Sequence, residues 1–202
     1  MKSIHHGLLT VNLSALSSGD SADYHCSMDT QSTEARVFIG GPPFSGKTAA
    51  GVILALQLGV PFVDLDRVIE SAAGMSVPDI FVRLGEEAFR DLETQALMEV
   101  AARNGGFVAA LGGGCLLRPG NLEAAMASGV LLMLTAGDDE LMSRARLQEG
   151  SRPLVKDVTS LKTLLASRRG HYASLPAPID TTGLAPEETA GRLLEKLRRS
   201  DA

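Results

Sequence analysis

A glycine-rich stretch, GGPPFSGKTAAG at residues 40–51, carries the residue types that hold a phosphate group. It satisfies the pattern G-x-x-x-x-G-K-[ST] between Gly41 and Thr48, after an apolar run and before a stretch of helical composition. Such a loop turns its backbone N–H groups inward, and the following helix adds its positive N-terminal end. Lys47 can reach the outer phosphates, and the Thr48 hydroxyl can be a ligand of Mg²⁺. The pattern therefore predicts a nucleotide-binding loop, with a plain glycine-rich turn as the alternative.

Phe44 is the unusual member of this loop. Loops of this type usually have a small residue there, because the backbone must come close to the phosphate. A phenylalanine is tolerated if its ring points outward, although a positive φ would strain its backbone. Pro42 and Pro43 remove two N–H donors and also stiffen the loop. We still expect nucleotide binding. The residues expected to contact the nucleotide are Gly41, Phe44, Ser45, Gly46, Lys47, Thr48 and Ala49.

Two aspartates follow an apolar run in the stretch VPFVDLD. If this stretch is extended, Asp64 and Asp66 face the same side. In a parallel sheet that side is the crevice at the carboxyl ends of the strands, where ligands bind. One carboxylate can hold Mg²⁺ through water, and the other can accept a proton from a substrate hydroxyl. The alternative is a strand-end aspartate that caps the next helix, a role that Asp66 alone could fill.

Three arginines are candidates for binding anions. Arg90 lies one helical turn before Glu93, where it could grip a carboxylate with both nitrogens or form only a surface ion pair with Glu93. Arg152 lies in the polar stretch LQEGSRPL between two predicted helices, the place for a mobile lid that carries an arginine to a transferring phosphoryl group. Arg168 precedes Tyr172 in the stretch SRRGHY, and its alternative is a solvated helix face.

Three consecutive glycines, Gly112 to Gly114, close a second apolar run in LGGGCL. Without side chains, their backbone N–H groups can approach a small polar ligand closely. The alternative is a tight turn with no ligand.

These residues need a scaffold, and the chain alternates strand-like and helix-like segments throughout. This alternation predicts a single α/β domain with a mostly parallel sheet. The expected strands are at residues 36–40, 60–66, 107–114, 130–134 and 177–180. The expected helices are at residues 46–59, 89–106, 121–129, 138–148, 158–175 and 185–199.

The composition is that of one soluble globular domain: 202 residues, 45% hydrophobic and 21% charged. The net charge of −5 and the lack of a long Lys/Arg block argue against a nucleic-acid partner. No apolar run approaches the roughly 18 residues that a membrane span requires. The two cysteines, Cys26 and Cys115, form neither a disulfide framework nor a metal-site spacing, so we expect a reducing compartment, the cytoplasm.

Residues 1–34 differ from the rest of the chain. Their weak apolar run is interrupted by polar residues, no convincing cleavage site follows, and acidic residues argue against a transit peptide. We predict a disordered tail at 1–34, followed by a single domain at 35–202. Met28, just before the regular pattern begins, is a candidate start codon.

The order of these motifs resembles the shikimate kinase family. The resemblance extends over about residues 36–199, and it rests on the phosphate loop, FVDLD, GEEAFRDLE, GGG, RPL and RRGHY. It implies a P-loop three-layer sandwich with a five-stranded parallel sheet and a mobile lid. It also implies ATP-dependent phosphorylation of the 3-hydroxyl of shikimate, with ATP and Mg²⁺ as cofactors. We expect the protein to be a monomer.

The resemblance assigns roles to the candidate residues. Asp66 would approach the attacking hydroxyl, and Lys47 and Arg152 would stabilise the γ-phosphoryl group. Thr48 and Asp64 would form the Mg²⁺ site. The residues implied to bind shikimate are Asp66, Arg90, Gly112, Gly113, Gly114 and Arg168.

The sequence departs from the family at three positions. Phe44 replaces a small residue, Leu111 replaces a hydroxyl residue, and Ser174 replaces a glutamate that often follows the tyrosine. Two alternative functions stay open. One is a kinase for another small hydroxy acid such as gluconate, which also offers a carboxylate and hydroxyls. The other is a nucleotide-binding pseudokinase.

Overall fold

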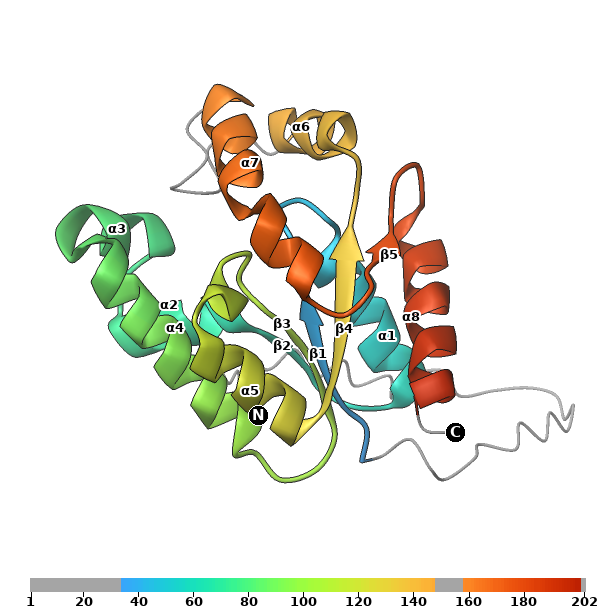
Figure 1. The fold of residues 1–202 in the computed structure, drawn as a ribbon. Helices are drawn as coiled ribbons and strands as arrows, with labels where there is room; N and C mark the ends of the chain where they lie inside the picture. The colour runs from blue at the N-terminus through green and yellow to red at the C-terminus, as the bar shows by residue number, and fades with distance from the viewer. Residues whose placement is uncertain (1–33, 148–157, 201–202) are drawn as a thin grey trace, which may run out of the picture.

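The core of the protein is a five-stranded parallel sheet with helices on both faces (Figure 1). The computed structural model describes residues 34–147 and 158–200. The strand order is β2-β3-β1-β4-β5, and every neighbouring pair is parallel. The strands are β1 (Arg36–Gly40), β2 (Phe62–Asp64), β3 (Phe107–Ala110), β4 (Val130–Thr135) and β5 (Ile179–Asp180). The expected fold class is confirmed.

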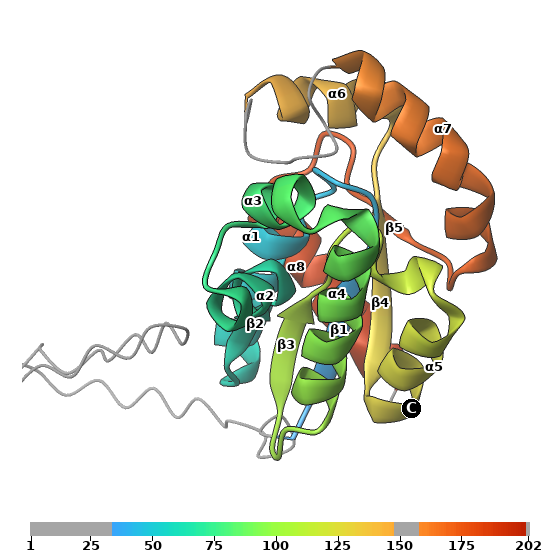
Figure 2. The same cartoon turned by 90° about the vertical axis from the view of Figure 1, so that its left-hand side faces the viewer.

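The helices form a layer on each face of the sheet and a group beyond the carboxyl ends of the strands. Helices α1 and α8 cover one face, and α4 and α5 cover the other (Figure 1). Helices α6 and α7 lie together past the ends of the strands (Figure 2). The helices are α1 (Lys47–Leu58), α2 (Leu65–Ala73), α3 (Val77–Arg83), α4 (Gly85–Ala101), α5 (Pro119–Ser128), α6 (Asp138–Arg146), α7 (Val158–Ser174) and α8 (Pro186–Ser200), with a 3₁₀ turn η1 (Cys115–Leu117).

The alternation of side chains along β1 separates two apolar cores. Val37 and Ile39 pack in a cluster with residues of α1 and α8. Phe38, between them, faces the other layer and packs with residues of α2, α3, α4 and α5. Its ring meets Phe107 edge-on at a centroid distance of 5.2 Å. Because both faces of the sheet are covered, the carboxyl ends of its strands are left as the place for a site.

Two helices were not expected from the sequence. The chain enters α2 directly after β2, and α3 follows with Ser76 as its N-cap, whose side chain accepts from the backbone N–H of Asp79. The premise that Asp64 and Asp66 belong to one extended segment is wrong, because β2 ends at Asp64 and Asp66 lies in α2. The predicted tail, except Glu34, and the predicted lid with Arg152 lie outside the described residues. The division of the chain at residue 35 stays a prediction.

Candidate active site

The phosphate loop joins β1 to α1 and depends on two glycines. Gly41 has φ 138° and Gly46 has φ 90°, conformations that favour glycine. A Cβ on Gly41 would also collide with the Leu134 carbonyl oxygen. Lys47 begins α1, is 5% exposed, and donates from Nζ to the carbonyls of Gly41 (3.0 Å) and Pro42 (2.7 Å). The loop thus holds an ammonium group at the N-terminus of a helix, a combination suited to phosphate oxygens.

Thr48 and Asp64 bring two side-chain oxygens together beside the loop. Thr48 Oγ1 donates to Asp64 Oδ2 at 3.1 Å. The other carboxylate oxygen of Asp64 accepts from the backbone N–H of Asp66 at 3.1 Å, so Asp64 caps α2. The helix-capping alternative therefore holds for Asp64 and not for Asp66. The contact is consistent with the pair of metal ligands predicted from the sequence, because Mg²⁺ takes oxygen ligands.

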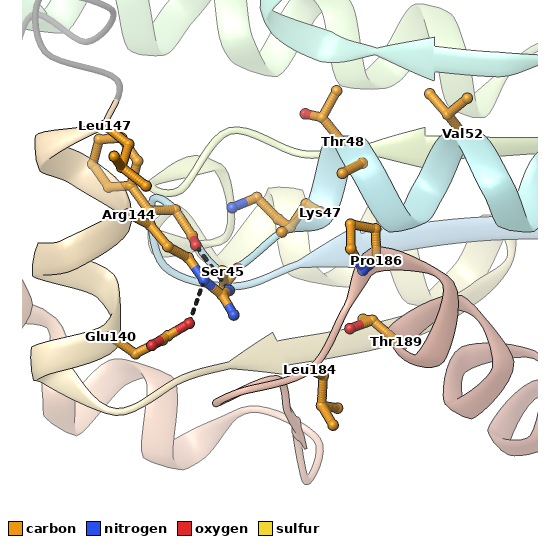
Figure 3. Close-up of a pocket in the computed structure, with 13 residues that line it drawn as sticks. Ser45, Lys47, Thr48, Val52, Glu140, Arg144, Leu147, Leu184, Pro186 and Thr189 are labelled. Atoms are coloured by element: carbon orange, nitrogen blue, oxygen red, sulfur yellow. Dashed lines mark hydrogen bonds and ion pairs between the residues drawn. The ribbon is translucent and has the colours of Figure 1, made fainter.

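A pocket of about 750 Å³ opens between the phosphate loop and helices α6 and α8 (Figure 3). Its size is typical of small-molecule sites. Arg144 reaches from α6 toward the loop, while Pro186 and Thr189 contribute from α8 (Figure 3). The residues that line the pocket are Phe44, Ser45, Gly46, Lys47, Thr48, Ala49, Val52, Glu140, Arg144, Leu147, Leu184, Pro186 and Thr189.

Among the described residues, Arg144 makes four hydrogen bonds. Its Nε donates to Glu140 at 2.9 Å, and Nη1 donates to the Phe44 carbonyl at 3.3 Å. Thr181, which follows β5, receives the other two: Oγ1 accepts from Nη1 at 3.1 Å, and the carbonyl accepts from Nη2 at 2.8 Å. The Thr181 hydroxyl also lies 3.2 Å from the Ser45 carbonyl. Thr181 therefore links the end of the sheet, the phosphate loop and Arg144.

A second group of polar residues is buried beside the glycine triplet; we call it the arginine cluster, and it comprises Arg90, Glu93, Arg168 and Tyr172. Arg90 Nη1 donates to Glu93 at 2.7 Å, and Nη2 donates to Glu86 at 3.0 Å. Arg90 is 7% exposed and Glu93 is 1% exposed, so their pair is buried rather than a surface pair. Burial raises the pKa of the Glu93 carboxyl, and the charge of Arg90 opposes that shift. Burial alone would lower the pKa of Arg90, but Glu93 and Glu86 outweigh it and raise that pKa.

The glycine triplet leaves the space that these side chains occupy. A Cβ on Gly114 would lie 2.6 Å from Nη1 and 2.8 Å from Nη2 of Arg90. A Cβ on Gly112 would collide with Glu93 and would lie 3.3 Å from Asp66 Oδ1. None of the three glycines has a positive φ. They are needed for close approach, and the triplet also forms the turn that begins η1.

Helix α7 adds Arg168 and Tyr172 to the arginine cluster. The Tyr172 hydroxyl donates to the Gly113 carbonyl at 2.6 Å. Arg168 is 7% exposed, which rules out the solvated-face alternative. Burial raises the pKa of Tyr172, and the charge of Arg168 and its hydrogen bond to Tyr172 oppose that shift. Arg169 by contrast is exposed and pairs with Asp138 at 2.9 Å.

The structure brings most of the predicted residues to two neighbouring places. The phosphate loop and Thr48 with Asp64 form one, and Asp66, Arg90, Arg168 and the glycine triplet form the other. The ring of Phe44 does not point outward, the condition under which the sequence predicts that it is tolerated: it is buried in an apolar cluster with residues of α6 and α7. Sequence reasoning missed Arg144 and Thr181, which carry no motif and are recognised only by what they contact.

Comparison with known proteins places these features in a family. A family model described as shikimate kinase matches residues 43–198. The shikimate kinase of Thermodesulfovibrio yellowstonii is 35% identical over 158 residues, covering 77% of this chain and 90% of that protein. That of Thermus thermophilus is 37% identical over 157 residues, covering 76% and 85%. A solved structure, shikimate kinase from Acinetobacter baumannii in complex with shikimate, is similar with a TM-score of 0.76 at 29% identity, covering 84% and 96%.

The contact between Gly114 and Arg90 generates a prediction about stability. Gly114→Ala should displace the guanidinium and leave Glu93 buried without its partner, a loss of about 1–3 kcal/mol in the free energy of unfolding. Gly191→Ala is the matched control, because Gly191 lies in α8 with open space around its Cβ position. That change should stabilise the protein by about 0.5–1 kcal/mol. Urea unfolding measures both, and equal effects of the two substitutions would contradict this role of Gly114.

Proposed function

The chain belongs to the shikimate kinase family, and from that premise we propose that it transfers the γ-phosphoryl group of ATP to the 3-hydroxyl of shikimate. One observation carries the acceptor half of this proposal. Two arginines, Arg90 and Arg168, are buried together beside a glycine triplet, close to a phosphate loop. A guanidinium group has five N–H donors, and the described residues show Arg90 using two of them on Glu93 and Glu86, so the two arginines together can also bind the carboxylate of an acceptor.

The nucleotide side uses the phosphate loop and the pocket next to it. The backbone of the loop and Lys47 would bind the outer phosphates of ATP, with the ammonium group held in place by the Gly41 and Pro42 carbonyls. The rest of the nucleotide would extend into the pocket, between Arg144 and Pro186. Arg152, outside the described residues, is proposed to neutralise charge on the transferring phosphoryl group.

Thr48 and Asp64 are the residues proposed to hold Mg²⁺. Their oxygens already lie 3.1 Å apart beside the loop. No group of three or more His, Cys, Asp or Glu side chains is gathered as a metal site within residues 34–147 and 158–200. Magnesium fits this arrangement, because it commonly uses one or two protein oxygens together with water and substrate phosphates. When bound, the ion supplies neutralisation of the charge on the phosphate oxygens.

The acceptor side would orient the hydroxyl that attacks. Arg90 and Arg168 would hold the carboxylate of shikimate. Glu93 would fix the orientation of the Arg90 guanidinium group through their hydrogen bond. The backbone at Gly113 and Gly114 would contact a ring hydroxyl. Asp66 lies next to Glu93 and Gly112, where it could accept the proton of the attacking hydroxyl as that oxygen bonds to phosphorus. Direct transfer needs positioning and charge neutralisation, and these residues would provide both.

Two further expectations from the sequence stay predictions: a cytoplasmic location and a monomeric state. In the described part of the chain, no helix combines the length and apolar character needed to cross a membrane.

An assay that couples ADP release to NADH oxidation tests the proposed function against its alternatives. The purified protein is given MgATP with shikimate, with gluconate, or with no acceptor. We expect ADP formation that depends on shikimate, with much slower release in the other two conditions. A faster rate with gluconate would support a different hydroxy-acid kinase. Nucleotide binding without turnover of any acceptor would support a pseudokinase.

The position of Asp66 generates a prediction that separates catalysis from binding. Asp66→Asn nearly conserves volume but removes the proton acceptor, so kcat should fall by about 10²-fold or more. The KM for ATP should change little. Asp91→Asn is the control, since Asp91 is exposed and pairs only with Arg118 among the described residues. An unchanged kcat in Asp66→Asn would remove Asp66 from the proton transfer.

A further inference from the structure

Phe44 adopts a backbone conformation that a phenylalanine normally avoids. Its φ is 65°, and it is the one non-glycine residue with a positive φ in the part of the chain that the structure describes. A glycine would adopt this conformation without strain. The loop nevertheless has a large aromatic residue here, so the strain must be offset by what the ring contacts.

The ring of Phe44 joins a third apolar cluster, separate from the two cores of the sheet. This loop–helix cluster comprises Phe44, Ala136, Leu141, Ala145, Leu161 and Leu165. Leu141 and Ala145 belong to α6, and Leu161 and Leu165 belong to α7. Phe44 is 8% exposed and is the only described member of the cluster from the phosphate loop. It is therefore the contribution of the phosphate loop to an apolar cluster that α6 and α7 share.

Both helices carry an arginine of the site. Arg144 of α6 lines the pocket and donates to the Phe44 carbonyl at 3.3 Å. Arg168 of α7 lies one turn after Leu165, which belongs to the same apolar cluster as Phe44. The pair between Arg169 and Asp138 joins the two helices at their surface. A change in the position of the Phe44 ring would therefore be transmitted to both arginines.

We propose that Phe44 is a positioning residue: its ring fastens the phosphate loop to α6 and α7 and thereby fixes Arg144 and Arg168 relative to Lys47. The expected effect on shikimate rests on the proposed function, because that proposal identifies the acceptor. The expected effect on nucleotide binding does not depend on which acceptor the protein uses. A small residue at this position would leave the loop and the two helices linked mainly by polar contacts, such as the Arg144 hydrogen bond to the Phe44 carbonyl.

The test compares Phe44→Gly with Phe44→Leu. Glycine removes the backbone strain together with the ring, whereas leucine keeps an apolar anchor. For Phe44→Gly, we expect the Kd for MgADP, measured by calorimetry, to rise about tenfold or more. The KM values for ATP and shikimate should both rise as well. Phe44→Leu should recover most of the binding, to within about threefold of the wild-type Kd.

Leu197→Ala provides the matched control. Leu197 is buried in the core between α1 and α8, away from the loop–helix cluster, and its truncation also removes buried apolar volume. It should lower Tm while leaving the Kd for MgADP unchanged. Three results would overturn the proposal: wild-type binding in Phe44→Gly, no recovery in Phe44→Leu, or an equal loss of binding in Leu197→Ala. Because MgADP binding needs no acceptor, a wrong acceptor assignment would leave this test intact.

Discussion

The buried ion pair between Arg90 and Glu93 is the interaction on which the acceptor half of the site depends. Both charges lie on α4, one turn apart, and both are almost fully buried. Burying such a pair costs desolvation energy that its attraction does not always repay, so stability alone is a weak reason to keep it. Glu93 Oε1 has no hydrogen-bond partner among the described residues. We interpret the pair as a means of holding the Arg90 guanidinium group in a fixed orientation, in which it can bind an anionic acceptor.

Other parts of the structure are arranged around this pair. Gly112 and Gly114 lack the Cβ atoms that would collide with Glu93 and Arg90. Tyr172 closes the cluster from α7 by its hydrogen bond to Gly113. The same helix contributes Leu161 and Leu165 to the apolar cluster that contains Phe44, so α7 contributes to both halves of the site. The acceptor half and the nucleotide half of the site thus use residues from different layers of the fold, and α7 contributes to both.

Local signals made the phosphate loop and the sheet predictable from the sequence. The loop pattern has its own spacing and context, and β1, β2 and β4 each contain an apolar run that ends at a glycine or a polar residue. The arrangement of Asp64 and Asp66 was not predictable in the same way, because the helix that begins at Leu65 has no strong start signal beyond Asp64 itself. The direction of the Phe44 ring and the burial of Arg168, next to the exposed Arg169, depend on tertiary packing. Arg144 and Thr181 come together from distant parts of the chain, and no local pattern marks them.

The most direct test of this account measures whether Arg90 contacts the carboxylate of the acceptor. KM values are determined for shikimate and for an analogue without the carboxylate, in the wild type and in Arg90→Ala. The wild type should prefer shikimate by about 1.5–3 kcal/mol, as expected for charged hydrogen bonds, and Arg90→Ala should lose most of that preference. Arg90→Lys should recover little, because a point charge cannot replace the planar fork. Equal discrimination by the wild type and Arg90→Ala would contradict the account.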